Sequence, residues 1–300
     1  MDEHPKRGSA LVRRRPAADL DIAESHYRQA MLNLSREPHE NRQIAEWFGL
    51  DAARYDRARP TYPQELIDRM VGLAPGTKFV DVGCGTGISS RLFQAAGGTV
   101  LGVEPDPRMA DFARGRGLDV EVARFEDWDP AGRTFDAVVS GTAWHWVDPL
   151  AGARKAADVL RPGGVLALFD NEPELPGAVL TALDEAYRYA VPDAPAEPGP
   201  EPGESVEDYA RNIYANQYTK AADGIGRTNA FGVPEGMRYE WDRTCTRDEW
   251  LDHLLTQGGF HALAPDALAR FQAHLGAAID EMGGAFTMHY ATVGIVAIRR

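Results

Sequence analysis

The sequence predicts an α/β protein built on a doubly wound, mostly parallel sheet. Between residues 78 and 169, short apolar runs alternate with stretches of helical periodicity, the pattern that βαβ units produce. The first run ends in the glycine-rich turn Gly83–Gly87, at the sheet edge where such folds bind ligands. With 300 residues, 44% of them apolar, the chain is long enough for one large α/β domain or two small ones.

The N-terminal quarter is predicted to be mainly helical. Apolar residues at mixed three- and four-residue spacings favour two helices within residues 20–49, separated by Pro38. A further helix is expected over Tyr62–Val71, where Pro63 suits the first turn. The basic run Lys6–Arg15 is interpreted as a mobile terminal arm, with a local anionic contact as the alternative.

The central elements follow in alternating order, and the breaker Arg161–Gly164 precedes the last of them. A parallel, doubly wound sheet is the simplest architecture for this alternation. The expected strands are Lys78–Val82, Thr99–Val103, Val120–Arg124, Phe135–Ser140 and Val165–Phe169, and the expected helices are Ile88–Ala96, Arg108–Arg114 and Pro149–Leu160.

An insertion separates this core from the last strands. Pro192–Glu204 is so rich in Pro and Gly that it is predicted to be an exposed loop. Downstream, we expect strands at Arg238–Arg243 and Phe286–Ile298 and helices at Arg247–Leu255 and Pro265–Met282.

Charge and cysteine content exclude several classes of function. The formal net charge of −13 disfavours a nucleic acid partner, because it would repel a phosphate backbone. Cys84 and Cys245 lie far apart without C-x-x-C spacing, so free thiols are expected, and no metal site is predicted. No apolar window is long enough to span a membrane and no secretory signal is visible, so a cytoplasmic location is the default expectation.

The glycine turn differs from a dinucleotide-binding turn. Its spacing is G-x-G-x-G, and Ile88 stands where G-x-G-x-x-G has its third glycine, which weakens a pyrophosphate interpretation. Glu104 follows Gly83 by 21 residues (104 − 83), close to the spacing of an acid that binds ribose hydroxyls. A ribose-bearing ligand is therefore predicted, with a surface carboxylate and a plain tight turn as the alternatives.

Four segments together resemble class I S-adenosylmethionine (SAM)-dependent methyltransferases. VDVGCGTG (80–87) is similar to the first signature of that family, and GVEPD (102–106) to the second. FDAVVS (135–140), with WHW at 144–146, is similar to the fourth strand and its loop, and VLRPGG (159–164) to the turn before the fifth. The resemblance covers about residues 55–171, and YDRARPTYP (55–63) resembles the lid segment of a small-molecule branch.

The resemblance implies a Rossmann-like, seven-stranded, mostly parallel sheet with an N-terminal helical lid and a helical cap inserted after the fifth strand. The implied division of the chain is a flexible arm at 1–19, the lid at 20–75, the SAM-binding core at 76–172, a cap over the acceptor site at 173–235 and the C-terminal part of the sheet at 236–300. The cap carries several aromatic residues suited to a small-molecule pocket, among them Tyr218.

The resemblance also implies which residues bind the cofactor. Asp81 and the backbone after the fourth strand lie near the methionine amino group, the glycine turn passes under the methionine and ribose, and the acid after the second strand holds the ribose hydroxyls. The end of the third strand meets adenine, where Glu126 and Asp127 are alternatives for the amino group. The implied set is Asp81, Gly83, Cys84, Gly85, Gly87, Glu104, Pro105, Phe125, Glu126, Ser140 and Thr142, with Tyr55 and Arg59 from the lid. Arg59 would pair with the methionine carboxylate, and an exposed arginine that caps a turn is the alternative.

His145 is the candidate for a catalytic group, as a general base near the transferring methyl, although a polar packing role between Trp144 and Trp146 is the alternative. The function that follows is in-line methyl transfer from SAM to a small molecule, leaving S-adenosylhomocysteine (SAH). A non-catalytic SAM- or SAH-binding partner protein and, less favoured, a nicotinamide-dependent oxidoreductase remain alternatives. The composition hints at secondary metabolism, and the acceptor atom and oligomeric state stay open.

Overall fold

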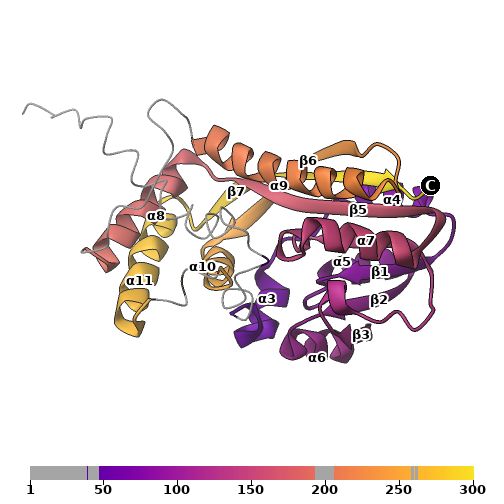
Figure 1. The fold of residues 1–300 in the computed structure, drawn as a ribbon. Helices are drawn as coiled ribbons and strands as arrows, with labels where there is room; N and C mark the ends of the chain where they lie inside the picture. The colour runs from indigo at the N-terminus through magenta and orange to yellow at the C-terminus, as the bar shows by residue number, and fades with distance from the viewer. Residues whose placement is uncertain (1–38, 40–46, 193–205, 258–259, 261–262) are drawn as a thin grey trace, which may run out of the picture.

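The computed structural model describes residues 39, 47–192, 206–257, 260 and 263–300. Their strands form one seven-stranded sheet in the order β3-β2-β1-β4-β5-β7-β6, which confirms the predicted doubly wound, mostly parallel architecture (Figure 1). The first five strands pair in parallel, and β7 runs antiparallel to both of its neighbours. The strands are β1 (Lys78–Val82), β2 (Thr99–Glu104), β3 (Asp119–Val122), β4 (Phe135–Gly141), β5 (Leu160–Glu174), β6 (Glu235–Thr246) and β7 (Ala285–Ile298).

Helices cover both faces of the sheet and extend beyond one end of it (Figure 1). The α-helices are α3 (Ala52–Ala58), α4 (Gln64–Leu73), α5 (Ile88–Ala95), α6 (Pro107–Gly115), α7 (Pro149–Val159), α8 (Gly177–Ala190), α9 (Val206–Thr228), α10 (Arg247–Leu255) and α11 (Pro265–Glu281). Short 3₁₀ turns occur at η3 (Phe48–Asp51), η4 (Phe125–Asp127) and η5 (Trp144–Trp146).

Side-chain caps fix where several helices begin. Asp106 accepts a hydrogen bond from the backbone N–H of Arg108 at the start of α6, and Asp148 caps α7 in the same way. Proline occupies the first turn of both helices, where its missing N–H costs nothing. Thr246 and Glu249 form a reciprocal capping box at the start of α10.

Alternation along the central strands divides the core into two layers. On β4, Val138 packs with residues of α7 and α9, whereas its neighbours Ala137 and Val139 pack with residues of α4, α5 and α6. Burial of both strand faces is what a parallel sheet between helices requires. A third apolar cluster joins α8, α10 and α11 around Trp250, outside the parallel part of the sheet.

Two strands are much longer than predicted. β5 does not begin after the Arg161–Gly164 breaker but runs through it, because Gly163 adopts a left-handed φ of 79° and its N–H bonds to the carbonyl of Arg299. The irregular stretch is accommodated by a register shift against β4. β6 spans 12 residues, since it pairs with β7 along its whole length. β3, by contrast, already ends at Val122.

Parts of the predicted organisation lie outside the described residues, namely the arm at 1–19, most of the two helices expected within 20–49 and residues 193–204 of the Pro- and Gly-rich loop. The two helices of the segment predicted to be the cap pack in different places. α9 packs against α7 on the sheet, whereas α8 packs with α10 and α11 from the C-terminal segment. The functional division into lid, core and cap therefore stays a prediction.

Candidate functional site

The glycine turn lies at the point where the strand order reverses. β1 lies between β2 and β4, so the loops that follow β1 and β4 leave the sheet side by side, which opens a crevice outside their carboxyl ends. Gly83, Gly85 and Gly87 all have left-handed φ values, of 63°, 54° and 88°. A Cβ added at Gly83 would lie 2.6 Å from the Cβ of Ala143, so the turn directly faces the loop after β4.

Asp81 at the end of β1 is fully buried and only half satisfied. Its Oδ2 accepts hydrogen bonds from the hydroxyls of Ser89 and Ser90, at 2.6 and 2.5 Å. Its Oδ1 has no hydrogen-bond partner among the described residues. Burial raises the pKa of Asp81 to about 6 in spite of the two serine hydroxyls.

Glu104 ties the end of β2 to the glycine turn. Its two carboxylate oxygens accept one backbone N–H each, from Gly85 at 2.8 Å and from Asp106 at 2.9 Å. Burial raises the pKa of Glu104 to about 7, although both hydrogen bonds oppose the rise. Pro105, beside it, is exposed.

Cys84 contributes to the turn through its backbone, because its side chain is buried against β2. A Cβ at Gly102 would lie 2.5 Å from the Cys84 sulfur, so the thiol occupies the space that Gly102 leaves. Burial raises the pKa of the Cys84 thiol well above its usual value.

The segment after β3 is held by its own contacts. Phe125 is buried and packs against Trp128 and Trp144, with both ring centroids 6.1 Å away. Glu126 pairs with Arg124 at 3.2 Å and accepts the backbone N–H of Asp148 at 3.0 Å. Of the two acids that the sequence left open for adenine, Glu126 is thus already engaged, whereas Asp127 is exposed.

Ser140 and Thr142 position the loop after β4. The Ser140 hydroxyl donates to the carbonyl of Val82 at 3.0 Å and so links β4 to β1. Thr142 has a φ of 51°, and its hydroxyl lies 2.9 Å from the hydroxyl of Tyr62. Its N–H donates to the carbonyl of Phe169 on β5. The loop is therefore tied to both neighbouring strands.

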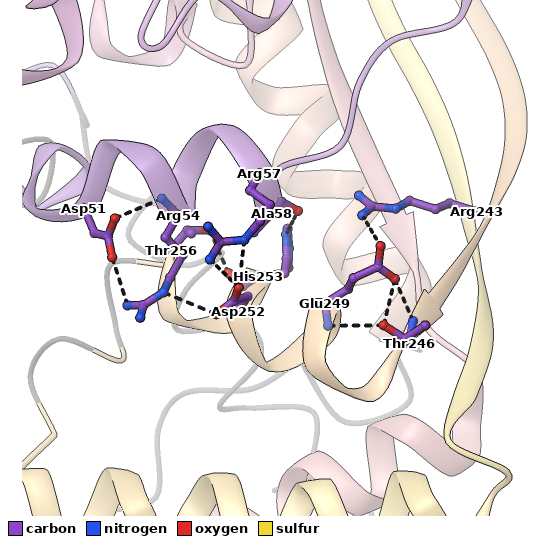
Figure 2. Close-up of polar contacts among 10 residues, drawn as sticks. All are labelled: Asp51, Arg54, Arg57, Ala58, Arg243, Thr246, Glu249, Asp252, His253 and Thr256. Atoms are coloured by element: carbon purple, nitrogen blue, oxygen red, sulfur yellow. Dashed lines mark hydrogen bonds and ion pairs between the residues drawn. The ribbon is translucent and has the colours of Figure 1, made fainter. Parts of the chain in front are cut away.

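Tyr55 and Arg59, which the sequence predicts to be lid residues, belong to α3 and its C-terminal end, which dock on α10 (Figure 2). Asp252 of α10 pairs with Arg57 at 2.6 Å and with Arg54 at 3.3 Å. Arg59 donates to the carbonyl of Thr256 at 2.8 Å, and its guanidinium lies 4.8 Å from the centroid of the Tyr55 ring. The Tyr55 ring thus already has a cation on one face.

His253 completes the α3–α10 contact. Its Nδ1 lies 3.3 Å from the carbonyl of Ala58 at the end of α3 (Figure 2). Its ring stacks on Trp250. Burial, followed by the charge of Arg59, lowers the pKa of His253 to about 3, so it is neutral at physiological pH. No local pattern in the sequence pairs α3 with a helix about 195 residues away.

His145 lies in η5, and its side chain is only 8% exposed. Its ring contacts Trp146, with the centroids 5.1 Å apart, and its Nδ1 lies 3.9 Å from Oδ1 of Asp170 on β5. Sequence reasoning missed Asp170, although its place directly after the predicted strand Val165–Phe169 is a usable signal, since functional groups gather at the carboxyl ends of strands.

Within the described ranges, no group of three or more His, Cys, Asp and Glu side chains is arranged to hold a metal ion. The helices of the same ranges include none whose length and apolar character would let it cross a membrane.

Part of this chain is similar in sequence to known methyltransferases. Residues 80–168 match the family model described as a methyltransferase domain. An uncharacterised methyltransferase of Mycobacterium tuberculosis is 39% identical over 134 residues, which are 43% of this chain and 54% of that protein. A demethylmenaquinone methyltransferase of Corynebacterium urealyticum is 28% identical over 226 residues, 67% of this chain and 93% of that one. The chain thus spans about half the length of the first of these relatives.

A solved structure shares the fold. A putative type II methyltransferase from Anaeromyxobacter dehalogenans is similar to this chain with a TM-score of 0.55 and 24% identity, covering 80% of this chain and 97% of that one. The matched residues 80–168 begin in β1 and end in β5, so they contain the glycine turn, Glu104 and His145. Residues 80–168 therefore match the methyltransferase-domain family, and the sheet around them has the fold of a methyltransferase.

Proposed function

We propose that this protein is a SAM-dependent methyltransferase that transfers the sulfonium methyl group to a small-molecule acceptor by in-line displacement and leaves SAH. The observation that carries the proposal is the acidic character of the glycine turn. Two buried carboxylates, Asp81 and Glu104, flank it, and burial raises the pKa of both. A phosphate would be repelled there, whereas a ligand with ammonium and hydroxyl donors would complete the hydrogen bonds.

The residues present fit such a ligand. Oδ1 of Asp81 and Oγ1 of Thr86 are buried without a hydrogen-bond partner in the described part of the chain. Each oxygen of Glu104 accepts a single N–H, which leaves one lone pair on each for a ribose hydroxyl. In the proposal, Asp81 meets the methionine amino group, Glu104 holds the ribose, and Phe125 lies against adenine beside Glu126 or Asp127.

The bound cofactor would supply an electrophilic methyl group, and the chain would supply alignment and exclusion of water. Holding two reactants at attack distance is worth roughly 7 to 11 kcal/mol. The loop after β4 is suited to alignment because Ser140 and Thr142 fix it to β1, to β5 and to Tyr62. In the proposal the α3–α10 contact closes the site, because it holds Arg59 beside Tyr55 and the charge of Arg59 acts on His145 in the loop after β4.

The proposal also covers the location, the class of acceptor and the branch of the family. A cytoplasmic location agrees with two cysteines that are both buried and free. A small-molecule acceptor, rather than nucleic acid, agrees with the formal charge of −13. A role in secondary metabolism, membership of the small-molecule branch with the YDRARPTYP lid segment and the assignment of that segment as a lid come from the sequence alone.

Calorimetric titration with SAM and with SAH tests the proposal. A matched pair of variants sharpens it: Gly85→Arg places a long side chain in the turn, and Gly117→Arg places the same side chain at another left-handed glycine with nothing within 4 Å. We expect binding in the micromolar range, about 1 μM to 1 mM, in the wild type and in Gly117→Arg, and no binding in Gly85→Arg. A folded wild-type protein that binds neither ligand would refute the function.

A further inference from the structure

A pocket opens on the α7 and α9 side of the sheet, next to the loop that faces the glycine turn. Its volume is about 560 Å³ when the open solvent at its mouth is included. Trp144 and His145 of η5, Leu168 and Asp170 of β5 and Gln217 and Tyr218 of α9 line it, and His39 and Lys220 also contribute. The pocket therefore joins the insertion to the carboxyl ends of β4 and β5.

Four buried polar atoms of this lining lack a hydrogen-bond partner in the described residues. They are Nε1 of Trp144, Nδ1 of His145, Oδ1 of Asp170 and Nε2 of Gln217. Leaving such an atom unpaired costs about 1 to 3 kcal/mol. Nδ1 of His145 and Oδ1 of Asp170 face each other, so the N–H groups of Trp144 and Gln217 are the ones that point to a ligand. The indole and the amide are donors, and the carboxylate is an acceptor.

His145 and Asp170 face each other at close to hydrogen-bond distance. Their side chains are 8% and 9% exposed, and 3.9 Å separates Nδ1 from Oδ1. A movement of about 1 Å brings this distance to that of a hydrogen bond. With Nδ1 turned to the carboxylate, the other ring nitrogen is free to meet a ligand in the pocket.

Tyr218 gives Asp170 two possible proton states. Its hydroxyl lies 2.8 Å from Oδ2 of Asp170 and 2.9 Å from the carbonyl of Val293. A hydroxyl has a single proton, so it donates to only one of these oxygens at a time. When it donates to the Val293 carbonyl, its oxygen accepts a proton held by Asp170. The geometry thus suits the carboxyl group both charged and neutral.

We propose, on the basis of the methyltransferase function above, that the acceptor carries a weakly acidic hydroxyl beside a carbonyl oxygen and that the His145–Asp170 pair removes the hydroxyl proton. Trp144 and Gln217 donate their unpaired N–H groups to the carbonyl oxygen of the acceptor. His145 is the base that contacts the acceptor, and Asp170 and Tyr218 are positioning residues behind it. A hydroxyl beside a carbonyl offers both the donor and the acceptor that this lining lacks.

The step balances in charge and electrons. A lone pair of the acceptor oxygen forms the new bond to the methyl carbon, and the carbon–sulfur bond breaks with its electron pair left on sulfur. The hydroxyl proton passes to Nε2 of His145, and Nδ1–H then donates to Asp170. The positive charge lost from the sulfonium is thereby carried by the protonated pair, which releases the proton to solvent afterwards.

The charged and titratable groups around the pair are consistent with one proton being taken up near neutral pH. Burial raises the pKa of Asp170 to about 6, against the Tyr218 hydrogen bond. Burial, followed by the charge of Arg59, lowers the pKa of His145 to about 3. Above pH 6 the empty pair is thus a carboxylate beside a neutral imidazole. The groups that face it from other elements are Tyr218 and Lys220 of α9, His39 at the pocket and Arg59 after α3.

Three matched probes test the acceptor class: an acetyl-naphthol, the acetyl-naphthylamine of the same skeleton, and the acetyl-naphthalene without either group. The first readout needs no turnover, because it is the binding of each probe to the complex of the protein with SAH. In the wild type we expect the naphthol to bind more tightly than the acetyl-naphthalene, because its hydroxyl donates to Nε2 of His145. In His145→Ala we expect this difference to disappear.

The second readout is methyl transfer from labelled SAM to the three probes. We expect transfer to the naphthol alone, with kcat lowered by about 100-fold or more in Asp170→Asn and KM changed little. The fall in wild-type rate below about pH 6 should be absent from Asp170→Asn, and combining Asp170→Asn with His145→Ala should cost little more than either change. A merely structural role of Asp170 would not move the pH profile.

Failure of this inference and failure of the methyltransferase function give different results in these experiments. A wild-type protein that binds SAH but binds the naphthol no more tightly than the acetyl-naphthalene, that methylates the naphthylamine equally well or that methylates none of the probes overturns the assigned acceptor class. Wild-type rates in Asp170→Asn overturn the role of the pair. Failure of the wild type to bind SAH refutes the methyltransferase function itself, and the inference with it.

Discussion

Adding a methyl group at Gly83 should destabilise the protein by an amount that the structure allows us to divide into two parts. Gly83 has a φ of 63°, which costs an L-residue about 1 to 2 kcal/mol. The added Cβ would also lie 2.6 Å from the Cβ of Ala143. Because carbon atoms in contact prefer a separation of about 3.5 to 4 Å, the overlap must be relieved by backbone movement, typically at about 1 to 3 kcal/mol. Gly83→Ala should therefore lower the free energy of unfolding by about 2 to 5 kcal/mol.

Two other glycines provide the controls for this experiment. Gly117 has a φ of 88° and nothing within 4 Å of an added Cβ, so Gly117→Ala should show only the backbone part, about 1 to 2 kcal/mol. Gly72 lies within α4 with equally open surroundings, and Gly72→Ala should stabilise the protein by about 0.5 to 1 kcal/mol. Urea unfolding of the three variants measures these differences. If Gly83→Ala costs no more than Gly117→Ala, the close approach between the glycine turn and the loop after β4 is not as described.

Three further predictions follow from the site and its surroundings. The pKa of Glu104 is about 7, above its ordinary value of 4.5, so the folded state holds the proton more tightly and the free energy of unfolding falls as pH rises between these values. Glu104→Gln should flatten this fall when urea unfolding is measured across the pH range. Parallel curves for the wild type and the variant would contradict the prediction. Asp252→Asn removes the ion pairs with Arg54 and Arg57. Amide hydrogen exchange in α3 should therefore accelerate, and SAH binding should weaken by up to about fivefold. Unchanged exchange protection of α3 would count against the α3–α10 contact. Cys84 and Cys245 are buried with raised pKa values, so a thiol reagent should label both only after unfolding, and rapid labelling of the native protein would disprove their burial.

The parallel half of the fold was predictable because its signals are local. The apolar run that forms β1 is bounded by turn residues, and its ends agree with the structure, as does the start of α5 at Ile88. The long antiparallel strands were not predictable in the same way. Only two of the twelve residues of β6 are buried, and charged side chains such as Arg238 and Glu240 stand among them, so no continuous apolar run marks its ends.

The candidate site also has a part that the sequence predicts and a part that it does not. Asp81, Glu104 and the glycines lie together because they stand at strand ends that the local sequence pattern predicts. The residues that approach them from other segments have no such local pattern. Asp252 meets α3, and Tyr218 meets Asp170, only through pairings between segments distant in the chain. Gln217 is polar without any local pattern that separates it from an exposed helix residue. Its importance becomes visible only because its amide nitrogen is buried without a partner.

Several of the buried polar atoms without a partner in the described residues lie along one edge of the sheet. Asp81 stands at the end of β1, Trp144 and His145 follow β4, and Asp170 lies near the end of the parallel part of β5, and these three strands are neighbours. Buried polar groups elsewhere in a folded chain are normally paired, because an unpaired one lowers stability. A run of such atoms along one edge is what the proposed ligand site would produce, and the described residues also include such atoms elsewhere, for example Oδ1 of Asp184. A donor held at β1 and an acceptor held at β5 would meet over the loop after β4, and binding both should stabilise the folded protein more than either alone.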